Sequence, residues 1–520
     1  MAILGFRDIA VICVAGSLHL FYRYRRKNQH PLPPSLQGWP IVGNAFQIPL
    51  TFVHVFYQDL GRKLGSKIVY VEAMGQPIVV INDAQIASDL LDKRSTIYSS
   101  RPQNRMLVEV IGAKYFFALL PYGEEWRNHR RIFQQHFSTK MTPREQETAL
   151  NFIQRGLLPN LYHNPKGLKE HVDGCIGGIS LSMTYGLPVQ RNHDSLIQKS
   201  ADAFAIAMSA ASPGKYLVNV IPILKYVPKW FPGAGFKRWA PLALTQLLEV
   251  LNEPYEQTLK RMDNGTAPES FVSSSLEIHR EGPDFETNEK HIKQAASQIF
   301  GAASETTVAS VMTFVLAMLK HPQIQRKVQQ EIDAIVGSDR LPDFTDREHL
   351  PYLAAVLKEV LRWNPIAPMG VPHSTTQEDY YEGYYIPKGS IVMANAHAIF
   401  QDEERFPNPK DFKPDRFIKD GVLKTDVLDP FVVATFGFGR RICPGMHIGQ
   451  SVLYLAAASI IYLFDISPAI DADGNTIEVE PEFIAASLVS EPLPFPCRIT
   501  PRKGKNVEGL LHEFLGTEVL

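Results

Sequence analysis

Apolar residues recur every three or four positions in the centre of the chain. Asn288 to Leu319 contains no proline and has apolar side chains at helical spacing, which predicts a helix of about 32 residues and about 48 Å. His321-Pro322 ends this helix, and 323–336 and 352–363 show the same spacing and predict two amphipathic successors. A helix as long as the first is expected to cross a large core.

Other stretches depart from this period. Residues 380–398 alternate around Pro-Lys-Gly at 387–389, which is typical of strands joined by a turn. An apolar helix is predicted from 446 to 464, and the polar stretch 261–290 is expected to form a surface connection. The pattern therefore predicts a fold that is mainly α with a smaller β region, built as a single large domain.

The N-terminal segment is mostly apolar up to Tyr22, and a basic cluster, Arg23, Arg25, Arg26 and Lys27, follows it. A secretory signal carries its basic residues before the apolar run. We therefore interpret 1–27 as a membrane anchor with its basic flank, and the positive-inside rule then leaves the body in the cytosol. The run is short for a full span, which needs about 20 apolar residues, so an interfacial helix and a cleaved signal are the alternatives.

Residues 28–45 are rich in proline, which fixes φ and removes a hydrogen-bond donor. We expect a stiff hinge here, between the anchor and a catalytic domain that spans 46–520. No internal repeat and no low-complexity linker interrupts that domain in the sequence.

Composition narrows the classes of function. The 520 residues carry a formal net charge of −1 and 45% of them are hydrophobic, as in an ordinary globular protein. Without a basic excess, nothing in the charge favours a nucleic-acid partner. The four cysteines, Cys13, Cys175, Cys443 and Cys497, are too scattered for a disulfide framework or a zinc cluster. Each is therefore judged by its neighbours, and ordinary packed thiols are expected at Cys175 and Cys497.

Cys443 has unusual neighbours. The stretch FGFGRRICPG, 436–445, holds three glycines, which let the backbone approach a bulky flat group. Pro444 suits the first turn of the helix that follows, so Cys443 lies at a helix N-terminus, where the dipole favours a thiolate. Arg441 is close enough in sequence to hold an anion. This setting suits an axial sulfur ligand of haem iron, and a plain buried cysteine in a tight turn is the alternative.

These residues resemble a known signature. Phe436, Gly439, Arg441, Cys443 and Gly445 match every fixed position of the haem-binding motif of the cytochrome P-450 monooxygenases. The resemblance covers essentially the whole chain, and it implies the cytochrome P-450 fold, a haem b cofactor and Cys443 as the iron ligand. The other four residues of the motif are then expected to hold the haem.

Further motifs follow in the family's order. Glu359 and Arg362 are three residues apart and share one helix face, and Arg416 lies in a later Phe-x-Pro-x-Arg-Phe stretch. In the family these three residues lock the core beside the haem. Taken alone, the Glu-x-x-Arg spacing is common and would equally fit a solvated pair on a helix.

The same resemblance places four residues at the haem propionates: Trp126, Arg130, His373 and Lys114. Trp126 and Arg130 match a family helix that reaches a propionate, and His373 follows in the segment after Arg362. Lys114 rests only on its position twelve residues before Trp126, and a plain surface lysine is the alternative.

On the long predicted helix, AASETT at 302–307 resembles the family's motif for delivering protons to dioxygen. That chemistry needs a hydroxyl near the oxygen and an ionisable group behind it, so Thr306 and Glu305 are the predicted catalytic residues. Ala303 stands where glycine is usual, which tightens the groove slightly. An ordinary Glu-Thr-Thr on a helix face is the alternative.

The substrate pocket is harder to define from the sequence. Its lining is expected, by resemblance, from the segment after Arg101, 200–230, Phe300, Ala303, 366–371 and 483–488, with Phe116, Phe117 and Met369 among the candidates. These residues are mostly apolar, so a lipophilic small-molecule substrate is expected, although any protein core is apolar too.

Two surface features suggest partners. The stretch 229–239 mixes four aromatic with three basic residues, which favours a membrane interface; a loop tucked into the core is the alternative. Arg127, Arg131 and Arg440 are expected to face an acidic electron-donor protein.

The resemblance thus implies a monooxygenase held in the endoplasmic reticulum membrane by a single N-terminal anchor, with its catalytic domain in the cytosol. Electrons would come from NADPH–cytochrome P-450 reductase, with cytochrome b5 as a further donor. The sequence resembles fungal members that tailor secondary metabolites, so we expect a terpenoid substrate first, then aromatic polyketides or indoles. The alternatives are a haem-thiolate isomerase or dehydratase, against which Glu305-Thr306 argues, and a non-enzymatic haem sensor or carrier.

Overall fold

The computed structural model describes residues 31–137, 140–190, 194–212, 214–484 and 488–514. The predicted anchor, 1–27, and the first residues of the predicted hinge lie outside this part of the chain.

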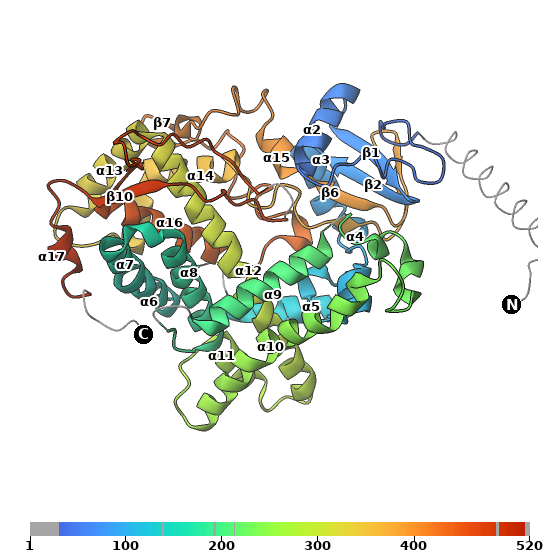
Figure 1. Ribbon diagram of the computed structural model, residues 1–520, viewed down its shortest axis with the longest axis horizontal. Helices are drawn as coiled ribbons and strands as arrows, with labels where there is room; N and C mark the ends of the chain where they lie inside the picture. The colour runs from blue at the N-terminus through green and yellow to red at the C-terminus, as the bar shows by residue number, and fades with distance from the viewer. Residues whose placement is uncertain (1–30, 138–139, 191–193, 213, 485–487, 515–520) are drawn as a thin grey trace, which may run out of the picture.

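Helices are the main regular structure of the described chain, as the sequence predicts (Figure 1). The longer ones are α5 (Glu124–His136), α8 (Leu168–Tyr185), α9 (Ser195–Ala211), α10 (Gly235–Asp263), α12 (Phe285–Lys320), α13 (Pro322–Val336), α14 (Pro351–Trp363) and α16 (Met446–Leu463). The shorter ones are α2 (Val53–Leu64), α3 (Ala84–Ala87), α4 (Ser95–Tyr98), α6 (Pro143–Leu150), α7 (Leu158–His163), α11 (Phe271–His279), α15 (Ala396–Phe400) and α17 (Val507–Leu511).

Helix α12 crosses the whole core, as predicted, and begins three residues before the predicted start. Its C-terminal half, Thr307 to Leu319, is buried on every side, which is the pattern of a helix surrounded by others. Helices α8, α9, α5 and α16 pack along it. Among the described residues, α12 and α16 are long and apolar enough to cross a membrane, but 72% and 78% of their most apolar windows are buried inside the protein. Both are therefore core helices.

The β region is small and divided, because the main sheet lies at one end of the molecule and two of the small sheets lie toward the other end (Figure 1). Its main sheet has the order β1-β2-β6-β3, formed by β1 (Ile68–Ala73), β2 (Gln76–Ile81), β6 (Ile391–Ala394) and β3 (His373–Ser374). Three two-stranded sheets complete it: β4 (Asp379–Tyr381) with β5 (Tyr384–Ile386), β7 (Ile418–Lys419) with β8 (Val422–Leu423), and β9 (Phe464–Pro468) with β10 (Cys497–Pro501). The strands predicted in 380–398 are thus present. β3 pairs antiparallel with β6, His373 opposite Val392, and this pairing fixes where His373 lies.

One prediction about the fold holds only in part. The polar stretch 261–290 was expected to run over the surface, but it contains α11, whose Phe271 is fully buried. The Phe271 ring stacks on Phe137, with ring centroids 5.7 Å apart. One short apolar stripe is enough to pack this helix of nine residues against the core. In the sequence, the polar residues on both sides hide so short a stripe from a search for periodicity.

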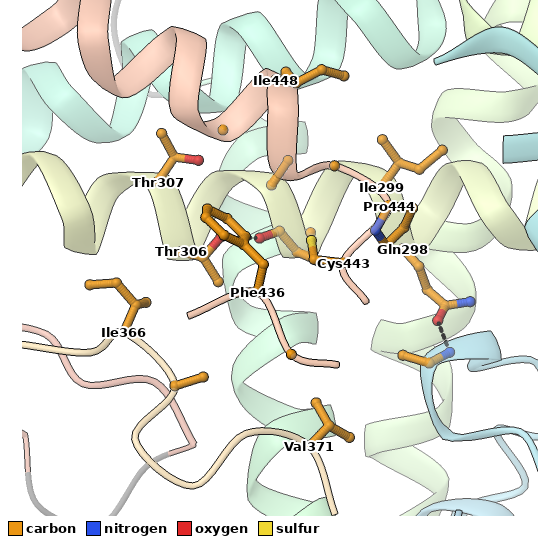
Figure 2. A pocket seen from close by; sticks show the side chains of 18 of the residues that line it. Gln298, Ile299, Thr306, Thr307, Ile366, Val371, Phe436, Cys443, Pro444 and Ile448 are labelled. Atoms are coloured by element: carbon orange, nitrogen blue, oxygen red, sulfur yellow. Dashed lines mark hydrogen bonds between the residues drawn. The ribbon is translucent and has the colours of Figure 1, made fainter. Parts of the chain in front are cut away.

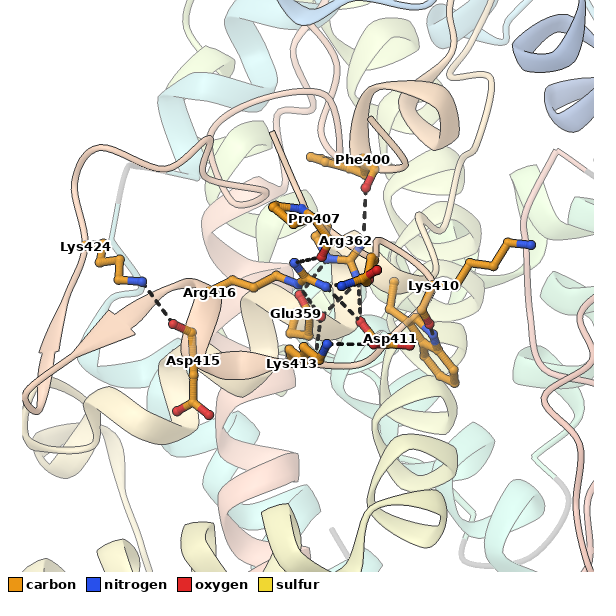
Figure 3. A network of polar contacts seen from close by, with 12 residues as sticks. Glu359, Arg362, Phe400, Pro407, Lys410, Asp411, Lys413, Asp415, Arg416 and Lys424 are labelled. Carbon is orange, nitrogen blue, oxygen red and sulfur yellow. Dashed lines mark hydrogen bonds and ion pairs between the residues drawn. The ribbon is translucent and has the colours of Figure 1, made fainter. Parts of the chain in front are cut away.

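A buried ionic network locks α14 to the segment that leads to the cysteine loop (Figure 3). Glu359 accepts from Arg362 through both oxygens, at 2.6 and 2.9 Å, and both side chains are 0% exposed. Arg416 lies 3.4 Å from the same carboxylate, and the backbone N–H of Lys413 donates to it at 2.6 Å. The remaining guanidinium nitrogens donate to backbone carbonyls, among them those of Phe400, Pro407, Asn408 and Asp411. A solvated helix pair is therefore excluded for Glu359 and Arg362.

Candidate active site

The cysteine loop is shaped by two glycines and one backbone hydrogen bond. The N–H of Cys443 donates to the carbonyl of Phe436 at 2.8 Å, which closes the loop just before α16. Gly437 and Gly439 have φ of 84° and 53°, values that favour glycine. A Cβ at Gly439 would also collide with the carbonyl of Leu91. The glycines of this motif therefore serve the loop's own fold as well as any ligand.

The Cys443 thiol points into a cavity of about 440 Å³. The exposed surface of this side chain faces the cavity and not bulk solvent, because the loop lies deep inside the protein. Burial raises the pKa of Cys443, while the N–H of Gly445 and the charge of Arg130 oppose that rise. The N–H at the start of α16 thus favours the thiolate, but burial outweighs it. A metal cation at the sulfur would supply the missing stabilisation.

Two observations test whether these residues fit the haem that the resemblance implies. Gly445 lines the cavity, and a Cβ added to it would meet no protein atom within 4 Å. Packing within the protein therefore does not require glycine here, whereas a flat group lying against the loop would. Phe436 lines the same cavity (Figure 2).

The second observation is a group of cations without an anion. Arg101 and Arg441 are 7% and 8% exposed, Arg130 is half-buried, and among the described residues no carboxylate pairs with any of the three. Arg441 donates to the carbonyls of Ser99 and Leu120 at 2.7 Å, yet its Nη1 has no hydrogen-bond partner. Burial lowers the pKa of Arg441 to about 9. An acidic group such as a pair of propionates would satisfy this site.

Arg101 is a candidate that the sequence reasoning passed over. It donates to the carbonyls of Ala118, Val371 and Pro372 at 3.2, 2.6 and 2.9 Å, and it lines the cavity. Burial and the charge of Arg441 lower the pKa of Arg101 well below its usual range. The only sequence signal is an arginine at the start of a segment already expected to line the pocket.

The other predicted propionate residues are placed differently. Trp126 and Arg130, on α5, and His373, on β3, line the cavity. The Arg441 guanidinium lies 4.3 Å from the centre of the Trp126 ring, and Arg130 donates to the carbonyl of Ile442 at 2.7 Å. Lys114, by contrast, is exposed and does not line the cavity, because the chain turns at Gly112, whose φ is 95°. The surface-lysine alternative describes Lys114.

His373 is held by its own backbone setting. It is 6% exposed, and its Nδ1 lies 2.8 Å from the carbonyl of Tyr98, so Nδ1 carries a proton and Nε2 is left for a ligand. Burial lowers the pKa of His373 well below its usual value. An anion next to Nε2 would reverse that effect and favour the charged ring.

Thr306 and Glu305 are neighbours on α12 but face different surroundings. Thr306 lines the cavity (Figure 2), and its hydroxyl donates to the carbonyl of Ala302 at 2.9 Å. The lone pairs of that hydroxyl stay free to accept. Glu305 does not line the cavity. Successive residues of a helix are rotated by about 100°, so the carboxyl of Glu305 is turned toward α8.

A cluster of charged groups surrounds Glu305 on that side. Lys169 of α8 pairs with Asp173 at 2.6 Å and with Glu491 at 3.2 Å, and Asp202 of α9 adds a further negative charge. Burial, with the net effect of these charges, raises the pKa of Glu305 to about 7. A carboxyl with this pKa takes up and releases protons at neutral pH.

The rest of the cavity is mainly apolar and matches part of the predicted lining. Phe116, Phe117, Ala303 and Met369 line it, as expected, and residues 366–371 contribute most of one side. From 200–230 only Ser200, Ala203, Phe204 and Met208 do so. Phe300 was expected there but packs edge-on against Tyr185, with ring centroids 6.0 Å apart. Phe483 is also absent from the lining and contacts Trp363.

Comparison with known proteins gives consistent matches. The family model for cytochrome P-450 matches residues 33–495. Cytochrome P-450 monooxygenase ple1 of Rhodocybe pseudopiperita is 40% identical over 499 residues, which cover 95% of each chain. Cytochrome P-450 monooxygenase claR of Ampulloclitocybe clavipes is 38% identical, over 92% of this chain and 88% of its own. Tryptamine 4-monooxygenase of Psilocybe cyanescens is 35% identical, over 94% and 97%.

Proposed function

The chain belongs to the cytochrome P-450 family, and we propose that it inserts one oxygen atom from dioxygen into a lipophilic small molecule of fungal secondary metabolism. Its relatives are named monooxygenases, in agreement with the class predicted from the motifs. The observation that carries the proposal is one apolar cavity lined by the Cys443 thiol, the unpaired Arg101 and Arg441, and Thr306.

Haem b is the cofactor we propose, held by Cys443 at its iron and by Trp126, Arg130, His373, Arg101 and Arg441 at its propionates. When bound, it supplies the iron at which dioxygen is activated. The protein's own part is to hold the substrate in a dry apolar space and to deliver protons. We assign delivery to the Thr306 hydroxyl, with Glu305 behind it as the group that exchanges protons with the charged cluster around Lys169.

The substrate class follows from the lining. Apolar side chains dominate it, but the hydroxyls of Thr184 and Ser200 are buried without a hydrogen-bond partner on the same cavity. Because both hydroxyls are fully enclosed, the apolar side chains define the substrate, and a lipophilic skeleton fits this lining. A terpenoid is our first expectation and an aromatic polyketide or indole the next. One relative is named tryptamine 4-monooxygenase.

Electrons are proposed to enter on the cysteine side. Arg127, Arg131 and Arg440 are all exposed. Arg440 donates to the Tyr122 hydroxyl at 2.7 Å, and Arg127 lies over the same ring, so both flank one surface. An acidic NADPH–cytochrome P-450 reductase, with cytochrome b5 as a further donor, would be steered to this surface by charge.

Attachment to the endoplasmic reticulum membrane is proposed through the anchor and through an exposed apolar surface. Trp230 and Phe231 are 78% and 47% exposed, whereas Trp239 packs on Tyr216. Four more exposed apolar side chains add to this surface: Trp39, Ile41, Phe46 and Leu50. Leu50 lies against Gly214.

In a chain lacking 1–27, the double variant Trp230→Ser, Phe231→Ser should shift protein from the microsomal pellet to the supernatant. An unchanged distribution would contradict this role for the two aromatic residues.

Oxygen uptake tests the proposed reaction. Haem-loaded protein in microsomes with reductase and NADPH should consume dioxygen faster when its substrate is added. When the dioxygen supplied is ¹⁸O₂, one atom of ¹⁸O should appear in the product. Product without oxygen uptake would indicate an isomerase or dehydratase. Haem binding without turnover of any lipophilic compound would indicate a sensor or carrier.

Thr306→Ala should uncouple NADPH use from product formation. The variant keeps Cys443 and the arginines, so haem and substrate binding should be unchanged. Without the hydroxyl, protons arrive at the wrong time, and the reduced oxygen leaves as hydrogen peroxide. General acid–base groups contribute about 10²- to 10⁴-fold, and water replaces part of the relay, so product per NADPH should fall about ten-fold or more.

The matched control is Thr306→Ser, which keeps the hydroxyl and should keep most of the coupling. Hydrogen peroxide and product are measured against NADPH in the same reactions. If Thr306→Ala couples as well as the parent protein at normal turnover, Thr306 is structural and the proton source lies elsewhere.

Glu305→Gln should change how stability depends on pH. The pKa of Glu305 is about 7 in the folded chain, above the ordinary 4.5, so the folded state binds more protons between these values. Stability therefore falls as pH rises through this window, by an amount on the order of 3 kcal/mol. Glutamine cannot ionise, so the variant should unfold at a higher temperature than the parent at pH 8 and at a similar temperature at pH 5.

The control for this effect is Glu305→Asp, which keeps an ionisable carboxyl and should keep the parent's pH dependence. Thermal unfolding of both variants is followed from pH 5 to 8. Equal pH dependence in the glutamine variant and the parent would show that Glu305 does not titrate in this range. Oxygen-dependent turnover of Glu305→Gln should be slower at every pH, because the group that exchanges protons is gone.

A further inference from the structure

A cluster of three possible metal ligands joins α5 to α12 outside the cavity. Glu125 and His129 lie on α5 and His291 lies on α12. One ligand atom from each lies within 4.8 Å of the other two, and the two imidazole rings have centroids 4.5 Å apart. None of the three residues lines the cavity around Cys443, so this cluster has no part in the chemistry described above.

His129 has its Nδ1 fixed by a backbone carbonyl. It is fully buried, and its Nδ1 lies 2.8 Å from the carbonyl of Glu125, so Nδ1 donates there, while its Nε2 contacts the Gln294 side-chain amide at 3.0 Å. Metal-binding histidines characteristically donate their second ring N–H to a carbonyl or carboxylate in this way.

His291 is the unexplained member of the cluster. It is 1% exposed, and neither of its ring nitrogens has a hydrogen-bond partner. Its Nε2 lies 3.3 Å from the Glu125 carboxylate but is not aligned with it for a hydrogen bond. Lys290 is the other charged group near this carboxylate, at 3.9 Å. Buried polar nitrogens without partners are rare and call for a ligand or a charge to satisfy them.

We propose that Glu125, His129 and His291 bind a transition-metal dication, with zinc as the best match. Two histidines and one glutamate, completed by water, are a known donor set of zinc. Donor atoms of a tetrahedral zinc lie about 3.4 Å apart, and Glu125 and His291 already have that spacing. Glu125 is half-exposed, so it can move onto the ion, and solvent gives the ion a way in. The Gln294 side chain, whose Oε1 lies 3.0 Å from His129 Nε2, would turn away to leave this nitrogen to the ion.

Bound metal would brace α5 against α12. Trp126 and Arg130, on the same helix α5, line the cavity, so the ion would steady residues that hold the haem without touching it. A ligand that binds only the folded chain stabilises it by RT ln(1 + [L]/Kd), so the unfolding temperature should rise with zinc concentration.

The test is zinc binding to the full-length, haem-loaded chain after treatment with a chelator. Equilibrium dialysis with zinc chloride should give one saturable zinc per chain, and zinc should raise the unfolding temperature. Magnesium, which prefers oxygen ligands, should do neither. Glu125→Gln should weaken zinc binding at least about ten-fold, and His291→Gln, read by the same dialysis, should do the same.

Glu124→Gln is the matched control, because Glu124 is the exposed neighbour of Glu125 on α5 and belongs to no cluster. It should bind zinc like the parent chain. The haem spectrum of each variant checks that it is folded. Absence of saturable zinc, or affinity that is the same in Glu125→Gln as in Glu124→Gln, would overturn the proposal. In that case His291 is only a buried partner of the Glu125 carboxylate.

Discussion

Replacing Cys443 by alanine should abolish the long-wavelength Soret band that a thiolate-ligated haem gives when reduced under carbon monoxide. Among the described residues, Cys443 is the one cysteine that lines the cavity. The loop is closed by a backbone hydrogen bond to Phe436, which alanine keeps, so the variant should fold. Cys443→His offers a nitrogen ligand instead and should also lack the band. Substrate oxidation should fall below detection in both variants.

The matched controls are Cys175→Ala and Cys497→Ala. Cys175 is buried beside the carbonyl of Phe152, and burial raises the pKa of Cys497 to about 11. Neither thiol lines the cavity, so both variants should keep the band and their activity. A thiolate-type band that survives in Cys443→Ala would mean that another residue supplies the sulfur.

Local patterns predicted much of the fold. The long apolar stripe before His321-Pro322 predicted α12 to within three residues at its start, because helix periodicity and a proline stop act on neighbouring residues. The Glu359–Arg362 spacing placed both side chains on one helix face, and a carboxylate can bind a guanidinium across one turn. The cysteine motif is equally local, since the φ values of its glycines depend on a few adjacent residues.

Features set by distant segments were not visible in the sequence. Arg101 is held by three carbonyls, one from residue 118 and two from residues 371 and 372, and no spacing along the chain signals that meeting. The structure does not place Lys114 at the cavity, for the converse reason. Its distance from Trp126 along the chain was the only argument for it, and the turn at Gly112 directs it to solvent.

The sequence also did not determine which way each side chain points around its helix. The sequence put Glu305 next to Thr306, but it could not say that only Thr306 would line the cavity. The packing of α8 and α9 against α12 decides this, and it also surrounds Glu305 with Lys169, Asp173 and Asp202. The raised pKa of Glu305 is thus a property of the tertiary fold, which the Glu-Thr-Thr motif does not contain.

Glu359→Gln should cost about 3–5 kcal/mol of stability, the range for breaking a buried ion pair. The carboxylate faces Arg362 at 2.6 Å and Arg416 at 3.4 Å (Figure 3). Removing its charge leaves two guanidinium groups in the interior without an anion, although their bonds to backbone carbonyls remain. The total free energy of unfolding of a native protein is only about 5–15 kcal/mol. We therefore expect little haem-loaded protein, and a strongly lowered unfolding temperature in what is recovered.

The matched control is Lys413→Ala on the same segment. The Lys413 ammonium pairs with Asp411 at 2.6 Å, but both side chains are about half-exposed, and exposed pairs contribute about 0–1 kcal/mol. Its backbone N–H, which binds Glu359, is kept in alanine. Yield of haem-loaded protein and unfolding temperature should therefore stay near those of the parent. If Glu359→Gln is no less stable than Lys413→Ala, the two arginines are held well enough by carbonyls alone, and the carboxylate is dispensable for assembling the haem pocket.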